Sequence, residues 1–598
     1  MALLSRASLV LFASGDLSGT QVFDLISAAW DDGWGRGDTL AEMLVHAGRG
    51  GLRRCDIAGD IVRAADAAGL VCNTCHPYSV TLRTGGELGV YLPHEIYAGV
   101  AAETPLAELC FNQDDLAATS GLPNMLKTWA AHADVQHDGD LTAVAALGFH
   151  ADGVQYSSSM RAGGAKSIVA ASMNVISAPS RKQRHRRQPL FVVSKHRICQ
   201  CGCGGFHTYQ DIMEVMAWSF GCLASGRAPS CRHDGSAWQQ DEVGRRIGDD
   251  INIPQAAFLQ VRGDWESFEQ LFRVRSVNSD KFCWMCEATQ TTLGPLHYHN
   301  FLPDAVHRTT LISHADYWTW CVHHGVEPSH FFRIPGFSLD MLAVDAMHTC
   351  DLGTFQDAAG SLFFLEIDNK RHHRNRNEGL KWLNRSLKSF YTAHGDEGLS
   401  SLAPLTLPQI IGKSLGYPFL KAKAAQTRHA AKFCLTLAQQ HQSGTADRRP
   451  FQFERNHRLL ARSAEHRNLV VEVFTGMTEF IGTCAADVFV PGDCRRGAYK
   501  YLQNLQTLNK MWRPPPASAI QKKRAPFRLR PKAHTMVHLV EEKILLFGNP
   551  ASFWCYRDED FIGVIKRTAG KSKHAWTLEK RVMEKLRITT GLQHQADR

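Results

Sequence analysis

The chain has 598 residues, of which 44% are hydrophobic and 21% are charged, a composition typical of ordinary globular proteins. No apolar run approaches the roughly 20 residues of a membrane span, and the first 14 residues lack a cleavage region, so we expect neither a membrane protein nor a secretory signal. The net charge of +9 favours a polyanionic partner. The positive charge is concentrated in four runs suited to phosphate contacts or nuclear import: Arg181–Arg187, Lys370–Arg376, Lys522–Lys532 and Lys566–Lys573.

The first part of the chain, residues 1–135, mixes Ala-rich helical patterns with Gly and Asp turns. It contains no catalytic constellation. We therefore expect a mixed, mainly α-helical N-terminal region whose role the residues do not indicate.

From about residue 140 the pattern changes to short apolar runs typical of strands. Three such runs are followed by a helix with one apolar face and then by a fourth run: Leu141–Phe149, Ser167–Ile176, Pro189–Ser194, the helix Asp211–Leu223 and the strand Phe258–Val261. Asp152 and Asp264 follow the first and fourth runs. This is the layout of an α/β, ribonuclease H-like core, in which neighbouring central strands bring the two carboxylates together.

Asp264 stands between an apolar strand and a helix, an arrangement that presents a metal ligand at the edge of a sheet. The helix is predicted from the spacing of Trp265, Phe268, Leu271 and Phe272. The Asp152-Gly153 pair also has a second interpretation, because Asp-Gly is a common hairpin turn.

Seventeen cysteines, grouped as CxxC and CxCxC motifs, indicate metal sites in a reducing compartment and not a disulfide framework. Cys283 and Cys286 form one CxxC, and His297 and His299 follow it, so these four residues are a candidate zinc site.

Cys199, Cys201, Cys203 and His207 form a second candidate zinc site. Thiols one residue apart alternate sides on an extended backbone, so this site requires a knuckle-like turn. The alternative is a glycine-rich loop with free thiols.

Residues 291–530 show mainly helical patterns, of which Arg458–Ile481 is the most strongly periodic. Trp512–Lys532 is basic and Pro-rich and is predicted to be an exposed loop. Asp345 and His348 stand at helical i, i+3 spacing, and His534 and His538 stand at i, i+4 before an aromatic cluster.

Several blocks of the sequence together resemble the transposases of CACTA-type DNA transposons and their Kyakuja-Dileera-Zisupton relatives. The blocks lie in the same order along residues 140–570: DGV from Asp152, GDW with CxxC from Gly263 to Cys286, DxMHxxxLG from Asp345, and PKxHxxxH followed by GxPxxFWxYxxE from Pro531 to Glu559. The resemblance implies a ribonuclease H-like core in residues 136–290 and 531–598, interrupted by a helical insertion at 291–530. Glu559 lies 295 positions after Asp264, a separation that accommodates this insertion.

The resemblance also implies catalytic roles. Asp152, Asp264 and Glu559 would be the three acids of a DDE transposase that cleaves transposon ends and transfers the strand. Asp345, with His348, is the reserve for the third acid and is otherwise an element of the insertion. Carboxylates suit Mg²⁺ or Mn²⁺, and two such ions support in-line attack on a phosphodiester.

Double-stranded DNA is the expected partner, together with a nuclear location and a homo-oligomer that joins two transposon ends. The residues expected to contact DNA phosphates come from two basic runs: Arg181, Lys182, Arg184, Arg186, Arg187, Lys522, Lys523 and Arg524. Trp554 is a candidate for base stacking, with core packing as its alternative. Two other functions stay open: an inactive, transposon-derived DNA-binding or zinc-stabilised interaction protein, and a nuclease without strand transfer.

Overall fold

The computed structural model describes residues 3–49, 56–71, 77–137, 139–157, 166–239, 242, 252–369, 373–411, 417–443, 463–513, 525–572 and 577–597. The chain divides into two compact units. Unit 1 comprises Met1–Val274, Trp318–Leu342 and Tyr556–Arg598, and unit 2 comprises Arg275–Tyr317 and Ala343–Cys555. Unit 2 thus begins earlier and ends later than the helical insertion expected at 291–530, and it includes the Cys283–Cys286 motif that we expected in the core.

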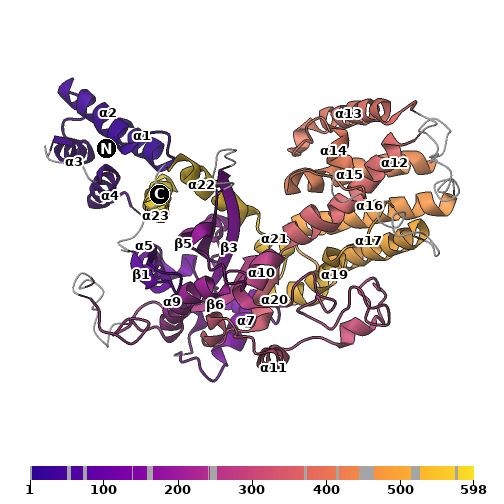
Figure 1. Cartoon of the computed structure of the whole chain (residues 1–598), viewed down its shortest axis with the longest axis horizontal. Coiled ribbons are helices and arrows are strands. Elements are labelled where there is room, and N and C mark those ends of the chain that lie inside the picture. The colour runs from indigo at the N-terminus through magenta and orange to yellow at the C-terminus, as the bar shows by residue number, and fades with distance from the viewer. Residues whose placement is uncertain are drawn as a thin grey trace. The chain divides into compact units, whose positions relative to one another are not determined.

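A mixed five-stranded sheet, in the order β5-β4-β3-β6-β7, organises unit 1 (Figure 1). Its strands are β3 (Ala145–Ser157), β4 (Lys166–Val175), β5 (Gln188–Ser194), β6 (Ala256–Gly263) and β7 (Leu342–Val344), and the division between the units falls within β7. β3 pairs antiparallel with β4, β4 pairs antiparallel with β5, and β3 pairs parallel with β6. The expected α/β class and the central pairing of the first and fourth strands are therefore present.

A bulge in β6 decides which residues share a face of this sheet. Leu147 lies opposite Phe258, but the next residue, Gly148, lies opposite Gln260, so Leu259 is an extra residue on β6. Because side chains alternate along a strand, the bulge places Gln260 and Arg262 on the face opposite to Phe258.

The two faces of the sheet differ in chemistry as a result. On one face, Phe258 stacks on Phe220 of α9 (Phe206–Ser225) at 4.3 Å between ring centroids, and Phe149 meets Phe331 at 5.2 Å. The other face carries His150 beside Arg262 and is contacted by α22 (Tyr556–Lys571). One face is thus an aromatic core, and the other holds buried polar groups.

The elements expected around the sheet are confirmed, with one change at β3. The helix expected at Asp211–Leu223 is α9, and α10 (Trp265–Phe272) has the predicted bounds. β3 continues five residues beyond Asp152, and Asp152 lies opposite Ala170 of β4. The hairpin-turn interpretation of Asp152-Gly153 is therefore wrong, because both residues are paired strand residues.

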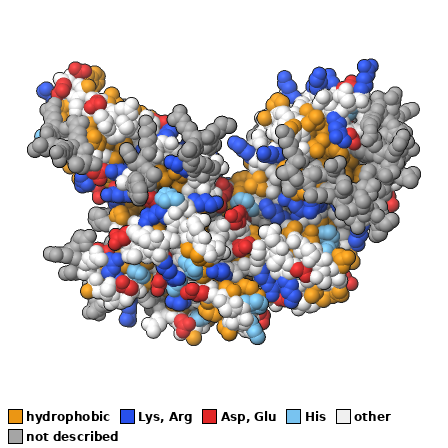
Figure 2. All heavy atoms as spheres, in the orientation of Figure 1, with side chains coloured by type: hydrophobic (Ala, Val, Ile, Leu, Met, Phe, Trp, Pro, Cys, Tyr) orange, Lys and Arg blue, Asp and Glu red, His pale blue; other side chains and the backbone are white. Residues whose placement is uncertain are grey.

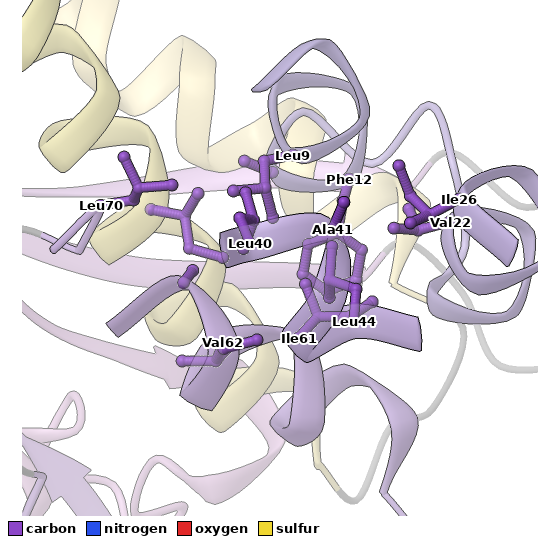
Figure 3. Close-up of a cluster of buried hydrophobic side chains, with 14 of the residues drawn as sticks. Leu9, Phe12, Val22, Ile26, Leu40, Ala41, Leu44, Ile61, Val62 and Leu70 are labelled. Atoms are coloured by element: carbon purple, nitrogen blue, oxygen red, sulfur yellow. The ribbon is translucent and has the colours of Figure 1, made fainter. Parts of the chain in front are cut away.

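Four N-terminal helices and the last helix form a separate apolar core within unit 1 (Figure 3). These are α1 (Leu3–Ala13), α2 (Gly19–Asp31), α3 (Thr39–Arg49), α4 (Ile57–Ala67) and α23 (Leu578–Asp597). Leu9, Phe12 and Ile61 are fully or almost fully buried against Ile588 of α23. Each such side chain contributes about 1.5–3 kcal/mol to folding. The chain's two ends therefore fold together.

The remaining elements before the sheet are short. The hairpin β1 (Tyr78–Thr81) and β2 (Glu87–Val90) precedes α5 (Pro93–Glu103), α6 (Gln113–Leu116) and α7 (Gly121–Ala130). The mixed, mainly helical character expected of residues 1–135 agrees with these elements.

Unit 2 is mainly helical. Its helices are α12 (Phe355–Ile367), α13 (Arg376–Ala393), α14 (Leu407–Ile410), α15 (Ala424–Ser443), α16 (Ala464–Ala485), α17 (Pro491–Trp512), α19 (Pro531–His538), α20 (Ile544–Phe547) and α21 (Pro550–Phe553). α11 (His314–His324) spans a division between the units. Helices α15, α16 and α17 pack side by side (Figure 1).

Of the exposed loop predicted at Trp512–Lys532, residues 514–524 lie outside the described residues, and the part that follows them is not exposed. In its described part, Ala525, Phe527 and Leu529 are at most 3% exposed. The Phe527 backbone N–H donates to Ser361 Oγ of α12 at 2.8 Å. The basic and proline residues suggested a solvated loop, but alternating apolar residues bury residues 525–529 against the helices.

Candidate metal centres and candidate active site

The CxxC motif of unit 2 forms a tight, buried turn. Cys283 and Cys286 are fully buried, and the Cys283 thiol accepts a hydrogen bond from the backbone N–H of Met285 at 3.4 Å. The Arg275 guanidinium donates to the carbonyl oxygens of both cysteines, at 3.2 and 3.3 Å. Arg275 thereby holds the turn closed, so that both thiols face the same point.

Two histidines of α19 face these thiols. The helix begins with Pro531, whose fixed φ suits a first helical turn, and places His534 and His538 on one face at i, i+4. Cys286 Sγ lies 3.3 Å from His534 Nε2, Cys283 Sγ lies 3.4 Å from His538 Nε2, and the two Nε2 atoms are 3.2 Å apart. All four ligand atoms lie within 4.8 Å of one another.

These distances fit a tetrahedral zinc site. With Zn–S of about 2.3 Å and Zn–N of about 2.0–2.1 Å, tetrahedral geometry separates sulfur from nitrogen by about 3.6 Å and nitrogen from nitrogen by about 3.3 Å. His538 Nδ1 is 2.8 Å from Glu542 Oε2, the carboxylate partner that commonly orients a metal-binding imidazole. Four buried protein ligands leave no open position, which is the pattern of a structural site.

The protonation of this cluster also prepares it for a cation. Burial alone would raise the pKa of the Cys283 thiol, but the hydrogen bond from Cys286 and the imidazoles of His538 and His534 hold it well below its usual value. Burial would lower the pKa of His538, but the Cys283 thiolate and Glu542 raise it to about 10. The thiol and the imidazole thus shift each other's pKa, and a metal ion bound between them would displace their protons.

The prediction that His297 and His299 complete this site is corrected. The two thiols face His534 and His538, whereas His297 and His299 contact each other, with their ring centroids 4.5 Å apart. Burial lowers the pKa of His299 to about 3. Proximity in the sequence favoured the wrong pair. The signal for the right pair was the i, i+4 spacing in α19, a known metal-ligand spacing on a helix.

The second candidate zinc site also comes together, in unit 1. The ligand atoms of Cys199, Cys201, Cys203 and His207 lie within 4.8 Å of one another. His207 Nδ1 is 3.4 Å from Cys201 Sγ and 3.7 Å from Cys199 Sγ. Hydrogen bonds outweigh burial and lower the pKa of the Cys203 thiol to about 7.

Glycines make this second cluster possible. Gly202, Gly204 and Gly205 all have positive φ, at 92°, 66° and 90°, which a residue with a side chain rarely adopts. This backbone supplies the knuckle-like turn that the spacing required. The cluster ends at α9, whose first turn carries His207. Because the four ligand atoms lie together, the structure favours a metal site over a loop of free thiols.

The first candidate acid lies on β3, and the second directly follows β6, the parallel neighbour of β3. His150 of β3 lies opposite Arg262 of β6, and two residues beyond this pair come Asp152 and Asp264. Both carboxylates are half-buried. Asp264 also caps α10, because its side chain accepts the Ser267 backbone N–H at 2.8 Å. The parallel pairing therefore brings the two acids to the same edge region of the sheet.

The third candidate, Glu559, is half-buried in the first turn of α22, which contacts β3. Asp152, Asp264 and Glu559 do not form one of the groups whose ligand atoms lie within 4.8 Å in the described chain. Its neighbour Asp558 is fully buried between two guanidiniums, so it is not a plain helix cap.

Asp345, the reserve acid, has both oxygens engaged. Oδ1 accepts the backbone N–H groups of Met347 at 3.0 Å and Cys555 at 2.8 Å, and Oδ2 accepts from the backbone N–H and Nδ1 of His348 at 2.9 and 2.7 Å. The ligand atoms of Asp345, His348 and Cys555 form a third close group. Four hydrogen bonds on one carboxylate are the pattern of a structural clasp.

The residues predicted to contact DNA differ in their accessibility. Arg181 and Lys182 are exposed on the short helix α8 (Arg181–His185), and Arg184 and Arg186 are half-buried. Lys522, Lys523 and Arg524 lie outside the described residues. On the face shown in Figure 2, Lys and Arg side chains lie among acidic and histidine side chains.

The structure argues against DNA contact for two of these residues. Arg187 is 9% exposed and bound to Asp558, so its guanidinium belongs to the core and not to a DNA surface. Trp554 has the Arg428 guanidinium over its ring at 4.0 Å, which favours the packing alternative over base stacking.

Comparison with known proteins gives no family: neither the search of family models nor the search of curated proteins returns a match to this chain. In the part of the chain that the structure describes, no helix is long and apolar enough to cross a membrane.

Proposed function

We propose that this chain is a metal-dependent DNA transposase of the DDE class, with Asp152, Asp264 and Glu559 as its acids. One observation carries the proposal. Strands β3 and β6 are central, parallel neighbours, and Asp152 and Asp264 each follow by two residues the register pair of His150 and Arg262. A ribonuclease H-like core requires this arrangement.

Glu559 supports the same proposal because its helix, α22, contacts β3, the strand that carries Asp152. Asp558, which precedes it, is bound to Arg262, two residues before Asp264. The long helical unit lies between β7 and α22 in sequence, as expected for an insertion before the third acid.

The chemistry follows from the ligand types. Half-buried carboxylates supply the oxygen ligands that Mg²⁺ and Mn²⁺ prefer. Divalent ions at such a site activate a water or 3′-hydroxyl and stabilise the leaving oxygen of a phosphodiester. The acids would hold their positions through Asp264's helix cap and the paired strand around Asp152, while exposed cations such as Arg181 and Lys182 contact the DNA backbone.

The test is Mn²⁺ binding by calorimetry to the zinc-loaded protein, with a short duplex DNA present. Alanine variants of Asp152, Asp264 and Glu559 should each weaken binding. Asp560→Ala is the control, because Asp560 lies on the same helix with its side chain 73% exposed. Asp345→Ala decides the third acid: loss of binding there, with Glu559→Ala unaffected, would transfer that role to Asp345.

A second candidate function is an inactive, metal-stabilised DNA-binding or interaction protein derived from such an element. The observation that favours it is the Cys283, Cys286, His534 and His538 group, which is fully assembled whereas the three acids are not gathered as closely. A wild-type protein that binds no Mn²⁺ even with DNA would favour this second function. A nuclease without strand transfer is distinguished from a transposase by its DNA products.

A further inference from the structure

Arg187, Arg262 and Asp558 form a buried group of ion pairs in unit 1, called the ionic layer below. Asp558 is fully buried, and its Oδ1 accepts from Arg187 Nε at 2.5 Å and from Arg262 Nη2 at 3.1 Å. Its Oδ2 accepts from Arg262 Nε at 2.9 Å. Both oxygens are therefore occupied by guanidiniums, and Asp558 is not available as a metal ligand.

The layer joins three elements of unit 1. Arg187 immediately precedes β5, Arg262 lies on β6, and Asp558 lies in the first turn of α22. Arg262 Nη2 also donates to Asn174 Oδ1 of β4 at 2.6 Å. One guanidinium thus ties two strands to the helix.

Two members of the layer, Arg262 and Asp558, stand close to a candidate acid in sequence. Arg262 precedes Asp264 by two residues, and Asp558 immediately precedes Glu559. His150 precedes Asp152 by two residues, is 1% exposed, and has no hydrogen-bond partner on either ring nitrogen among the described residues. Residues two apart on a strand share a face, so His150 and Asp152 lie on the same side of the sheet. Arg262, opposite His150, binds Asp558 of α22.

We propose that Asp558 is a positioning residue, whose ion pairs with Arg187 and Arg262 set Glu559 against Asp152 and Asp264. The proposal rests on the proposed function, because it concerns the geometry of the same site. Helix α22 follows a separate unit of the chain, so neither sequence proximity nor strand pairing orients it. A buried pair with one geometry gives that orientation, since misplacing it would leave charges buried and unpaired. Catalytic groups need this kind of support from the residues behind them.

The experiment is a Mn²⁺ titration of the full, zinc-loaded chain, followed by electron paramagnetic resonance of free Mn²⁺. The variants are Asp558→Asn, Glu559→Gln and the double variant, with Asp560→Asn as the exposed control on the same helix. We expect Asp558→Asn to weaken Mn²⁺ binding by roughly 10–100-fold, the usual effect of removing a residue that supports a ligand. Asp560→Asn should change affinity by less than about twofold.

The double variant separates positioning from general damage. If Asp558 acts through Glu559, adding Asp558→Asn to Glu559→Gln weakens binding by no more than about twofold. Effects that multiply would overturn the proposal, because Asp558 would then act independently of Glu559. Wild-type affinity in Asp558→Asn would also overturn it and leave the proposed function intact. A wild-type protein that binds no Mn²⁺ refutes both.

A second variant covers the case in which Asp558→Asn does not fold. Arg262→Lys keeps the charge but removes the two-pronged contact of Nε and Nη2 with the carboxylate. We expect it to remain folded by circular dichroism and to lose Mn²⁺ affinity partially. A folded Arg262→Lys protein with wild-type affinity would show that the layer's geometry does not set the site.

Discussion

Replacing Cys283 by serine tests the buried metal centre most directly. The two four-residue Cys/His groups predict about two zinc ions per wild-type chain. Cys283→Ser removes one of four ligands from the closed site, so the purified variant should retain about one ion, held by the Cys199 group.

The size of the effect of zinc on stability follows from the linkage between binding and folding. A ligand that binds only the folded state, at 100 to 1,000 times its dissociation constant, adds about 2.7–4.1 kcal/mol to the free energy of unfolding. For a unit of this size, each kcal/mol raises the melting temperature by about 2–4 °C. Zinc should therefore raise the melting transition of unit 2 by roughly 5–16 °C, and this increment should vanish in Cys283→Ser.

Cys434→Ser is the matched control. Cys434 is a fully buried, free cysteine of α15 in the same unit and belongs to none of the metal groups. Both variants place a hydroxyl in the interior, which costs about 1–3 kcal/mol. Any further difference in stability between Cys283→Ser and Cys434→Ser is therefore due to the lost metal ion. The assays are zinc content by mass spectrometry and thermal melts with and without a chelator. Equal zinc content and equal chelator response in the two variants would refute the metal centre.

Three other measurements test neighbouring features. Gly148→Ala should lower the melting temperature clearly, because a Cβ there would lie 2.4 Å from Arg262 Nη1. Gly153→Ala should lower it only slightly, because the nearest atom to a Cβ there is at 3.9 Å. Equal effects would contradict the close packing around Arg262. Arg187 and Arg262 outweigh burial and hold the pKa of the Asp558 carboxyl well below its unfolded value of about 3.9, so its stabilisation is present above about pH 4 and is lost as the pH falls further. The melting temperatures of wild type and Asp558→Asn should therefore approach each other as the pH falls below about 4, and parallel curves would argue against the ion pairs. Alkylation of Cys201, the exposed thiol of its group, should slow when zinc is bound, and a zinc-independent rate would exclude it as a ligand.

The local elements of the core could be predicted because their signals are local. The apolar runs at Ser167–Ile176 and Pro189–Ser194 are β4 and β5 within one residue, and the periodicity of residues 265–272 gives α10. The continuation of β3 beyond Asp152 could not be predicted, because it depends on pairing with β4 and Asp-Gly is a turn signal in isolation.

The partners of buried groups depend on contacts over long sequence distances. Cys283 and His538 are 255 residues apart, and His297 is far closer in sequence to the thiol than the histidine that faces it. Likewise, Arg187 belongs to a basic run that predicts a DNA surface, but it forms a buried ion pair with Asp558, 371 residues away. The sheet face of Arg262 depends on a bulge that leaves no pattern in the sequence.

Asp345 explains how a helix so far along the chain can carry the third candidate acid. The carboxylate lies directly after β7 and accepts the backbone N–H of Cys555, the last residue before α22, across 210 residues. Closing a flexible loop of that length costs about 5 kcal/mol in entropy. In unit 2 this cost is offset by the Asp345 clasp, by helix packing and by the Cys283 and His538 cluster, all of which form within the unit. The chain therefore leaves and re-enters unit 1 at points joined by a hydrogen bond. Because Cys555 is held at the end of β7, α22 begins only a few residues from a fixed point of the chain and not at the end of a free 210-residue loop. The ion pairs of Asp558 therefore need only orient the helix.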